Sequence, residues 1–174
     1  QGYAAAQVRL GILYDMGIGT DQNDEKASHF LHKASLQGHA DAQFCLGHKY
    51  KTGLNVEKDD TMAAHYFRLA AKQGHANAQL LMGLAYDNGH GVEQSFKKAA
   101  HYYKLAAGQY IVEAQCLLAA MYLGGLGVVQ SDKKAFRFYK LAADQGDSSA
   151  QCIVGTMYEA GQGVEQNFDT AFSY

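Results

Sequence analysis

The chain has 174 residues and a formal net charge of −2, from 15 Lys and Arg against 17 Asp and Glu. No run of like charge exceeds a pair, which argues against nucleic-acid binding, because phosphates are neutralised by clustered positive charge. The longest apolar runs, such as residues 116–122, fall far short of the roughly 20 residues that span a bilayer. We therefore expect a soluble chain without membrane insertion. Gln1 in place of Met, and an end inside a helix pattern, indicate a piece of a longer protein.

The sequence consists of copies of one 36-residue unit. An Ala-Gln pair marks each copy, and a tyrosine and a glycine follow it at fixed offsets. These residues are Gln7, Gln43, Gln79, Gln115 and Gln151, then Tyr14, Tyr50, Tyr86, Tyr122 and Tyr158, then Gly17, Gly53, Gly89, Gly125 and Gly161. The period predicts a single solenoid fragment over residues 1–174, because each unit needs its neighbours to bury its apolar faces. The expected units are about residues 2–37, 38–73, 74–109, 110–145 and 146–174, the last truncated.

Each unit begins with a predicted helix, which in the third copy runs from about residue 76 to residue 87. Gln79, Met82, Gly83 and Tyr86 stand at i, i+3, i+4 and i+7, which places them on one helix face. Gly89 follows at the place where a helix ends in a left-handed residue, a conformation in which a Cβ is costly. The pattern therefore predicts that the first helix stops at this glycine.

A second predicted helix opens at a small polar residue that can cap it by accepting a bond from a free backbone N–H. Its buried stripe in the third copy is Ala99, Tyr102, Tyr103 and Ala106, again at helical spacing. The capping positions of the five copies are Asn23, Asp59, Ser95, Ser131 and Asn167. Together the two patterns predict an all-α fold, a right-handed superhelix of antiparallel helix pairs.

The motif Ala-Gln-x-x-Leu-Gly-x-x-Tyr-x-x-Gly-x-Gly-Val, followed by Lys-x-Ala and Tyr-x-x-x-Ala-Ala, resembles the Sel-1-like repeat family, a relative of the tetratricopeptide repeats. The resemblance covers almost the whole chain. It implies an adaptor or scaffold for protein assemblies, of a kind common in bacteria, where several members are secreted or act on host cells. A subgroup carries a disulfide in each unit, and this chain lacks that cysteine pattern. We expect Cys45, Cys116 and Cys152 to be small buried hydrophobes.

Similarity with tetratricopeptide stacks implies that the first helices line a concave groove. First-helix positions that vary between copies, while framework residues stay fixed, are candidates for contact with a peptide or protein partner. The alternative interpretation is that the acidic and Asn residues complement the helix dipole and that Phe44 and Leu80 are core. The candidate partner-binding residues are Asp41, Phe44, His48, Lys51, Asn77, Leu80, Leu84, Glu113, Cys116 and Thr156.

Two polar patterns are interpreted as structural. The repeated glutamines are expected to bond to backbone of their own or the adjacent unit, because buried amides need partners. Cys45 and His48 form a Cys-x-x-His pair, which could be half of a zinc site or a nucleophile with its base, but no second ligand pair accompanies it. His29, His65 and His101 recur at the repeat period and lie too far apart to share a metal. The sequence therefore predicts no metal, no cofactor and no catalytic residue.

The fourth unit carries apolar side chains where other units have Gly, His, Asp, Lys or Glu. We expect them to form a contiguous patch that a partner, or another part of the full protein, covers. The alternative is that Tyr110 cannot adopt glycine's left-handed geometry, reshapes its turn and folds its neighbours into the stack. The candidate patch residues are Tyr110, Ile111, Val112, Leu123 and Val129.

The leading hypothesis is a non-enzymatic interaction module that holds a peptide or partner protein in its concave groove, in a protein secreted from a bacterium. One alternative is a repeat-built enzyme of cell-wall or β-lactam chemistry, for which we identify neither paired carboxylates at a fixed spacing nor a His with an orienting acid. The other alternative is a spacer beside a catalytic domain outside this fragment.

Overall fold

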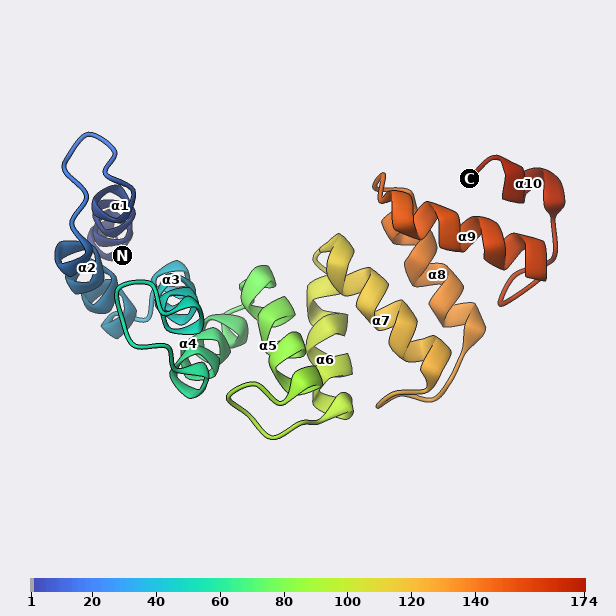
Figure 1. Cartoon of the computed structure of the whole chain (residues 1–174), viewed down its shortest axis with the longest axis horizontal. Helices are drawn as coiled ribbons and strands as arrows, with labels where there is room; N and C mark the ends of the chain where they lie inside the picture. Colours follow the sequence, from blue (N-terminus) through green and yellow to red (C-terminus); the bar gives the residue numbers. More distant parts are fainter. Residues whose placement is uncertain (1) are drawn as a thin grey trace. The chain divides into compact units, whose positions relative to one another are not determined.

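The computed structural model describes residues 2–174, and over that range it contains ten α-helices and no β-strand (Figure 1). The all-α repeat fold predicted from the 36-residue period is confirmed. Within the described range, no helix combines the length and the hydropathy that crossing a membrane requires. The helices are α1 Gly2–Met16, α2 Asp24–Leu36, α3 Ala40–Thr52, α4 Asp60–Lys72, α5 Ala76–Asn88, α6 Phe96–Ala107, α7 Val112–Gly124, α8 Asp132–Ala143, α9 Ser148–Ala160 and α10 Phe168–Phe172.

The helix ends lie where the predicted signals place them. The first helix of a unit, such as α3 or α7, ends at a left-handed glycine whose N–H bonds to the carbonyl four residues earlier. Gly53 has φ 73° and Gly125 has φ 66°. The second helices start after a side chain that accepts a backbone N–H, and all five predicted capping residues do this: Asn23, Asp59, Ser95, Ser131 and Asn167. Local sequence alone thus fixes where each helix begins or ends.

The chain divides into two compact units, one of residues 1–85 with 89–93 and the other of residues 86–88 with 94–174. In the first unit, Val8 and Leu31 pack with Ala34, Ala42 and Leu46 in a core formed by α1, α2 and α3. The core of the second unit combines small and large side chains from α7, α8 and α9, which lets the helix axes approach closely. Its buried members are Ala119, Ala135, Tyr139, Ala142, Ala143, Ala150, Val154 and Met157.

A stacked aromatic pair joins the two helices of the first four helix pairs, and a fifth stack joins α9 to Tyr174 just after α10. In the first pair, the Tyr14 and Phe30 rings have centroids 5.9 Å apart and lie 3° from parallel. Three of these stacks also carry a lysine ammonium over the first ring, as Lys26 does above Tyr14 at 5.1 Å. The other pairs are Tyr50–Tyr66, Tyr86–Tyr102, Tyr122–Phe138 and Tyr158–Tyr174.

The repeated glutamines are structural, as the sequence predicts. The Gln43 amide donates to the Ser35 carbonyl at 3.5 Å, and its oxygen accepts from the Gln73 amide at 2.7 Å. The same pattern recurs around Gln115, which is fully buried, accepts from Gln145 at 2.8 Å and donates to the Ala107 carbonyl. Each glutamine side chain therefore ties the start of a first helix to the ends of the second helices before and after it.

One buried ion pair has no counterpart in the other repeats as far as residues 2–174 show. Lys49 of α3 is only 3% exposed, and its ammonium pairs with the Asp15 carboxylate of α1. Leu13, Met121 and Met157 stand at the equivalent place in other copies, where an apolar residue needs no partner. Burying a lone ammonium is expensive, so Asp15 is required once Lys49 is present.

Candidate interaction surface

The candidate surface in the first unit lies on one face of α3 and continues onto α5. Asp41, His48 and Lys51 of α3 are exposed, and Phe44 beside them is half-buried. Their spacing of three, four and three residues places all four side chains on one side of the helix. On α5, Asn77 is exposed and Leu84 is half-buried. We call this set the first-helix surface: Asp41, Phe44, His48, Lys51, Asn77 and Leu84.

A contact between aromatic and charged side chains links α3 to the start of α5. The Phe44 ring stacks on His75, with centroids 4.4 Å apart and planes 19° from parallel. His75 Nδ1 accepts the Ala78 backbone N–H at 3.1 Å, so its other nitrogen, Nε2, carries the proton in the neutral ring. Nε2 lies 3.5 Å from Asp41 Oδ1. His75 therefore contacts both the Phe44 ring and the Asp41 carboxylate, and connects these two side chains of α3 to the start of α5.

Leu80 does not belong to this surface. Its side chain is only 7% exposed, and Val8 at the equivalent place of the first repeat is similarly buried. An aliphatic side chain at this position turns into the helix packing, which corrects the expectation that Leu80 contacts a partner. The alternative interpretation of Leu80 as core is confirmed.

Two hollows adjoin the first-helix surface. One, of about 450 Å³, lies at the start of α3 and is lined by Asp41, His39, Gln37 and Gln73 among others. The second is about 50 Å³ and lies beside Lys51. Space of that size holds water rather than a peptide side chain. The larger hollow has a mixed lining, in which Ala4 and Ala40 lie beside the polar side chains.

The equivalent positions of the second unit are less distinctive. Glu113 of α7 and Thr156 of α9 are exposed, and the Thr156 hydroxyl is bonded to the Ile153 carbonyl at 2.8 Å. Cys116 is half-buried, and burial raises the pKa of its thiol. Cys152 is exposed, which contradicts its predicted burial, because α9 borders an open hollow at this position where the short helix α10 faces it.

The predicted apolar patch of the fourth repeat is not contiguous. Tyr110 is 73% exposed before α7 and Val129 is 85% exposed after it. A helix of this length separates its ends by about 20 Å. Val112, Leu123 and their neighbours do not bridge the gap, because both pack against the core of the second unit. Ile111 is half-buried.

The alternative for the fourth repeat is also corrected. Tyr110 itself adopts φ 63°, the left-handed geometry expected of glycine. Its N–H bonds to the Ala107 carbonyl at 3.1 Å, as the N–H of Gly74 bonds to the Ala71 carbonyl at 3.0 Å. The turn keeps its shape, and the cost of a side chain in this conformation is of the order of 1 kcal/mol.

Two Ser-x-x-Lys spacings bear on the enzyme alternative, because this motif occurs in serine β-lactamases. They are Ser95 with Lys98 and Ser131 with Lys134. Each serine oxygen accepts the N–H of its own lysine at 3.4 Å as a helix cap. The Lys98 ammonium lies over the Tyr86 ring at 5.0 Å and so acts in the aromatic stack. Across residues 2–174, no three His, Cys, Asp or Glu side chains are grouped as metal ligands, Cys45 and His48 included.

Comparison with known proteins identifies the repeat. The Sel1 repeat family model matches residues 4–39, 40–75, 76–109, 112–147 and 148–174. A protective antigen of uropathogenic Escherichia coli strains displaying an SLR fold has 37% sequence identity and a TM-score of 0.93, over 98% of this chain and 37% of that one. A Sel1 repeat protein from Oxalobacter formigenes has 34% identity and a TM-score of 0.92, over 98% of this chain and 70% of that one.

A third solved structure shares the fold alone. Helicobacter pylori cysteine rich protein B has 23% identity and a TM-score of 0.57, over 72% of this chain and 96% of that one. The chain thus spans 37% of the length of the Escherichia coli antigen, 70% of the Oxalobacter formigenes protein and 96% of the Helicobacter pylori protein. No curated protein sequence is significantly similar to it.

Proposed function

The chain belongs to the Sel1 repeat family, whose members are generally protein-interaction scaffolds, and we propose that it binds a peptide or a partner protein through the first-helix surface. The sequence predicts that the first helices line a concave groove, and the first-helix surface is the part of it whose side chains vary most between repeats. The proposed role is non-catalytic.

The observation that carries the proposal is the contrast between framework and surface positions on the same helix. On α3, Gln43 and Leu46 are buried and match the other repeats in kind, whereas Asp41, His48 and Lys51 are exposed and differ from them. Buried framework residues explain stability. The exposed residues take no part in the core, and an interaction module needs such a variable face.

The charges on this face define what a partner must offer. Asp41 and Lys51 lie ten positions apart on α3, or about 15 Å along the helix. A bound segment would place a cation near Asp41 and a carboxylate near Lys51, with an apolar side chain between them against Phe44. The order of these groups gives the segment one preferred direction.

The enzyme alternative receives no support from the two Ser-x-x-Lys pairs, since their serines cap helices and their lysines stack on tyrosines. For the location, similarity to a bacterial protective antigen supports secretion from a bacterium. That location is part of this proposal.

Selection from a displayed peptide library tests the function. We expect selected peptides to bind the wild-type chain and to lose about tenfold in affinity when Asp41 and Lys51 are exchanged as Asp41→Lys with Lys51→Asp. The exchange keeps the net charge of the protein, so a loss of affinity shows that the peptide depends on the order of the two charges along α3. Peptides made with the reversed charge order should recover affinity for the exchanged variant.

A matched control changes the exposed second-helix residue His65 to Lys and should leave binding within about twofold. The proposal is wrong if the selected peptides bind the exchanged variant as well as the wild type, or if the His65 variant loses as much.

A further inference from the structure

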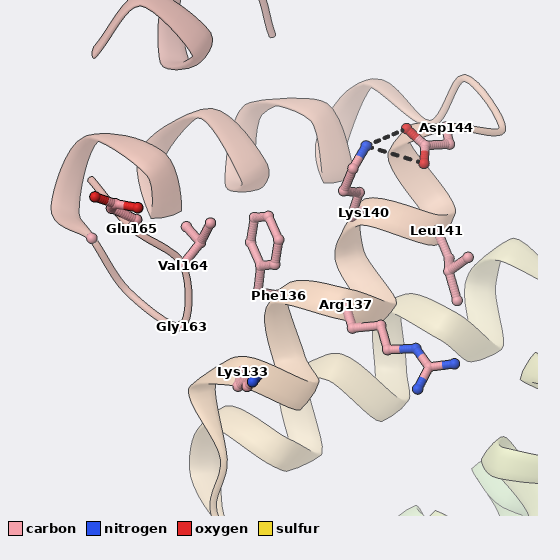
Figure 2. Close-up of a pocket in the computed structure, with 10 residues that line it drawn as sticks. Lys133, Phe136, Arg137, Lys140, Leu141, Asp144, Gly163, Val164 and Glu165 are labelled. Atoms are coloured by element: carbon pink, nitrogen blue, oxygen red, sulfur yellow. Dashed lines mark hydrogen bonds and ion pairs between the residues drawn. The ribbon is translucent and has the colours of Figure 1, made fainter. Parts of the chain in front are cut away.

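The second unit contains a hollow of about 940 Å³ between α8 and the loop that follows α9 (Figure 2). Phe136 and Leu141 of α8 and Val164 of the loop supply apolar side chains to it, and Lys133 and Arg137 supply positive charge. Figure 2 shows the Phe136 ring between Val164 on one side and the Lys140–Asp144 pair on the other. We call this hollow the α8 groove. Its size lies within the usual range for ligand pockets, about 300–1,000 Å³.

The cations of the α8 groove fall into two kinds. The Lys140 ammonium donates to both Asp144 oxygens, at 2.9 and 3.2 Å, and to the Tyr174 hydroxyl at 2.9 Å. These hydrogen bonds raise the pKa of Lys140 and hold its side chain in place. Lys133 and Arg137 are exposed and form no ion pair with any described residue. Their charges are therefore available to a ligand.

The groove coincides with departures from the repeat. Phe136 is an aromatic residue at a place where the earlier copies have small side chains, and Arg137 is a permanent cation where they have histidine. The earlier residues are Ser28, Ala64 and Ala100 at the first place and His29, His65 and His101 at the second. The half-buried Phe136 ring meets the Tyr158 ring edge to face, with centroids 5.2 Å apart. It therefore has a fixed orientation in the groove wall.

The exposure of the apolar floor does not depend on the neighbouring repeat. Leu141 is 36% exposed, and Leu105 at the equivalent place of α6 is 40% exposed although α7 and α8 follow it. The leucine side chain on this face is left open in both copies. What distinguishes the α8 groove is the aromatic ring and the arginine beside it.

We propose that the α8 groove binds an acidic peptide segment that carries an aromatic or aliphatic side chain. The apolar side chain would lie against Phe136, Leu141 and Val164, and carboxylates next to it would pair with Lys133 and Arg137. Arginine binds a carboxylate through two parallel hydrogen bonds, which adds direction to the attraction. Glu165 on the loop wall disfavours a ligand that is acidic along its whole length. This inference goes beyond the first-helix surface, and either proposal can fail without the other.

Fluorescence anisotropy with synthetic peptides tests the proposal. The probe is a labelled peptide in which Phe is flanked by Glu, compared with the same peptide carrying Lys for Glu and with one carrying Ala for Phe. We expect the acidic peptide with Phe to bind most tightly and its affinity to fall as salt is raised. The double variant Lys133→Glu with Arg137→Glu should bind it at least about tenfold more weakly.

Two further variants separate binding from folding. Phe136→Ala restores the residue found in α4 and α6 and should weaken binding about tenfold, as truncation of an anchor contact does. Lys97→Glu with His101→Glu introduces glutamates at the equivalent positions of α6 and should leave binding unchanged. Circular dichroism melts check that each variant is folded.

Several results would overturn the proposal. They are equal or tighter binding of the Lys peptide, an equal loss in the α6 variant, and no binding of the acidic peptide up to millimolar concentration. Sedimentation would show a fourth: if the wild type self-associates through this face and the Lys133/Arg137 variant is monomeric, the occupant is a second copy of the chain.

Discussion

Replacing Tyr103 by Phe should measure the part-buried hydrogen bond that this α6 side chain makes to a carboxylate. The Tyr103 side chain is fully buried, and its hydroxyl donates to Asp87 Oδ2 at 3.0 Å. Hydrogen bonds to charged groups contribute about 1.5–3 kcal/mol. Asp87 is half-buried, so water can replace part of the lost contact, and the expected cost lies near the lower end, about 1.5 kcal/mol.

The chain offers a matched control for this change. Tyr139 occupies the equivalent place one repeat later and is nearly as buried, yet its hydroxyl makes no hydrogen bond with the described residues. Tyr139→Phe should therefore change the free energy of unfolding by less than about 0.5 kcal/mol. Phe67 at the same place of the second repeat shows that the packing accepts a phenylalanine.

Urea unfolding followed by circular dichroism measures both variants, and it is repeated at alkaline pH. Burial, then the Asp87 charge and the hydrogen bond to it, raise the pKa of Tyr103 above its usual value near 10. The unfolded chain loses this proton first, so the stability that Tyr103 contributes is present below pH 10 and is lost as the pH rises further. Tyr103→Phe should remove that part of the alkaline loss. Equal costs for the two variants at neutral pH would refute the reasoning.

Three other predictions concern single sites. Gly47→Ala should cost about 1–3 kcal/mol in urea unfolding, because a Cβ would lie 2.6 Å from the Phe67 ring; an unchanged midpoint would show that the ring moves aside freely. Iodoacetamide, followed by peptide mass spectrometry, should label exposed Cys152 first and Cys45 last, since burial raises the pKa of the Cys45 thiol; the reverse order would contradict the burial of Cys45. Burial lowers the pKa of His32 below its usual value near 6.5, so the unfolded state takes up the proton first and stability falls as the pH drops below about 6.5. His32→Gln should make that fall shallower, and an identical pH profile would count against it.

The sequence predicts those parts of the fold that depend on local chemistry. The capping residues, the helix-ending glycines and the glutamine contacts each act within a few residues or repeat with the period, so their pattern is visible without coordinates. The pair between Lys49 and Asp15 is different, because it joins residues 34 positions apart, and the residues equivalent to Lys49 in the other copies are apolar. A periodic pattern describes the average unit. An exception in one unit, such as Lys49, can be interpreted only when the position of the neighbouring helix is known.

The candidate site is less predictable for the same reason. Comparison between repeats selects variable positions, and Asp41, His48 and Lys51 are exposed as that comparison implies. It does not distinguish a variable surface residue from a variable core residue, and Leu80 is of the second kind. The α8 groove lies on a second helix, whereas the comparison between repeats considered only the first helices. The sequence does indicate this site, because Phe136 stands where the earlier copies have small residues.

The loop glycines after the first helices have a consequence for engineering with these repeats. A Cβ at Gly91 would collide with the Asp60 backbone, and one at Gly163 would collide with the Asp132 backbone, each at the start of the preceding second helix. Gly19 in the first repeat has nothing within 4 Å of the same position. The second repeat carries Asn55 at the equivalent place, with φ 60°, so a designed array that moves the first repeat inward should keep Gly19 or replace it with Asn, which tolerates the left-handed conformation. The close approach of this loop residue to the backbone of the preceding second helix therefore limits which side chains an internal module can carry at this position.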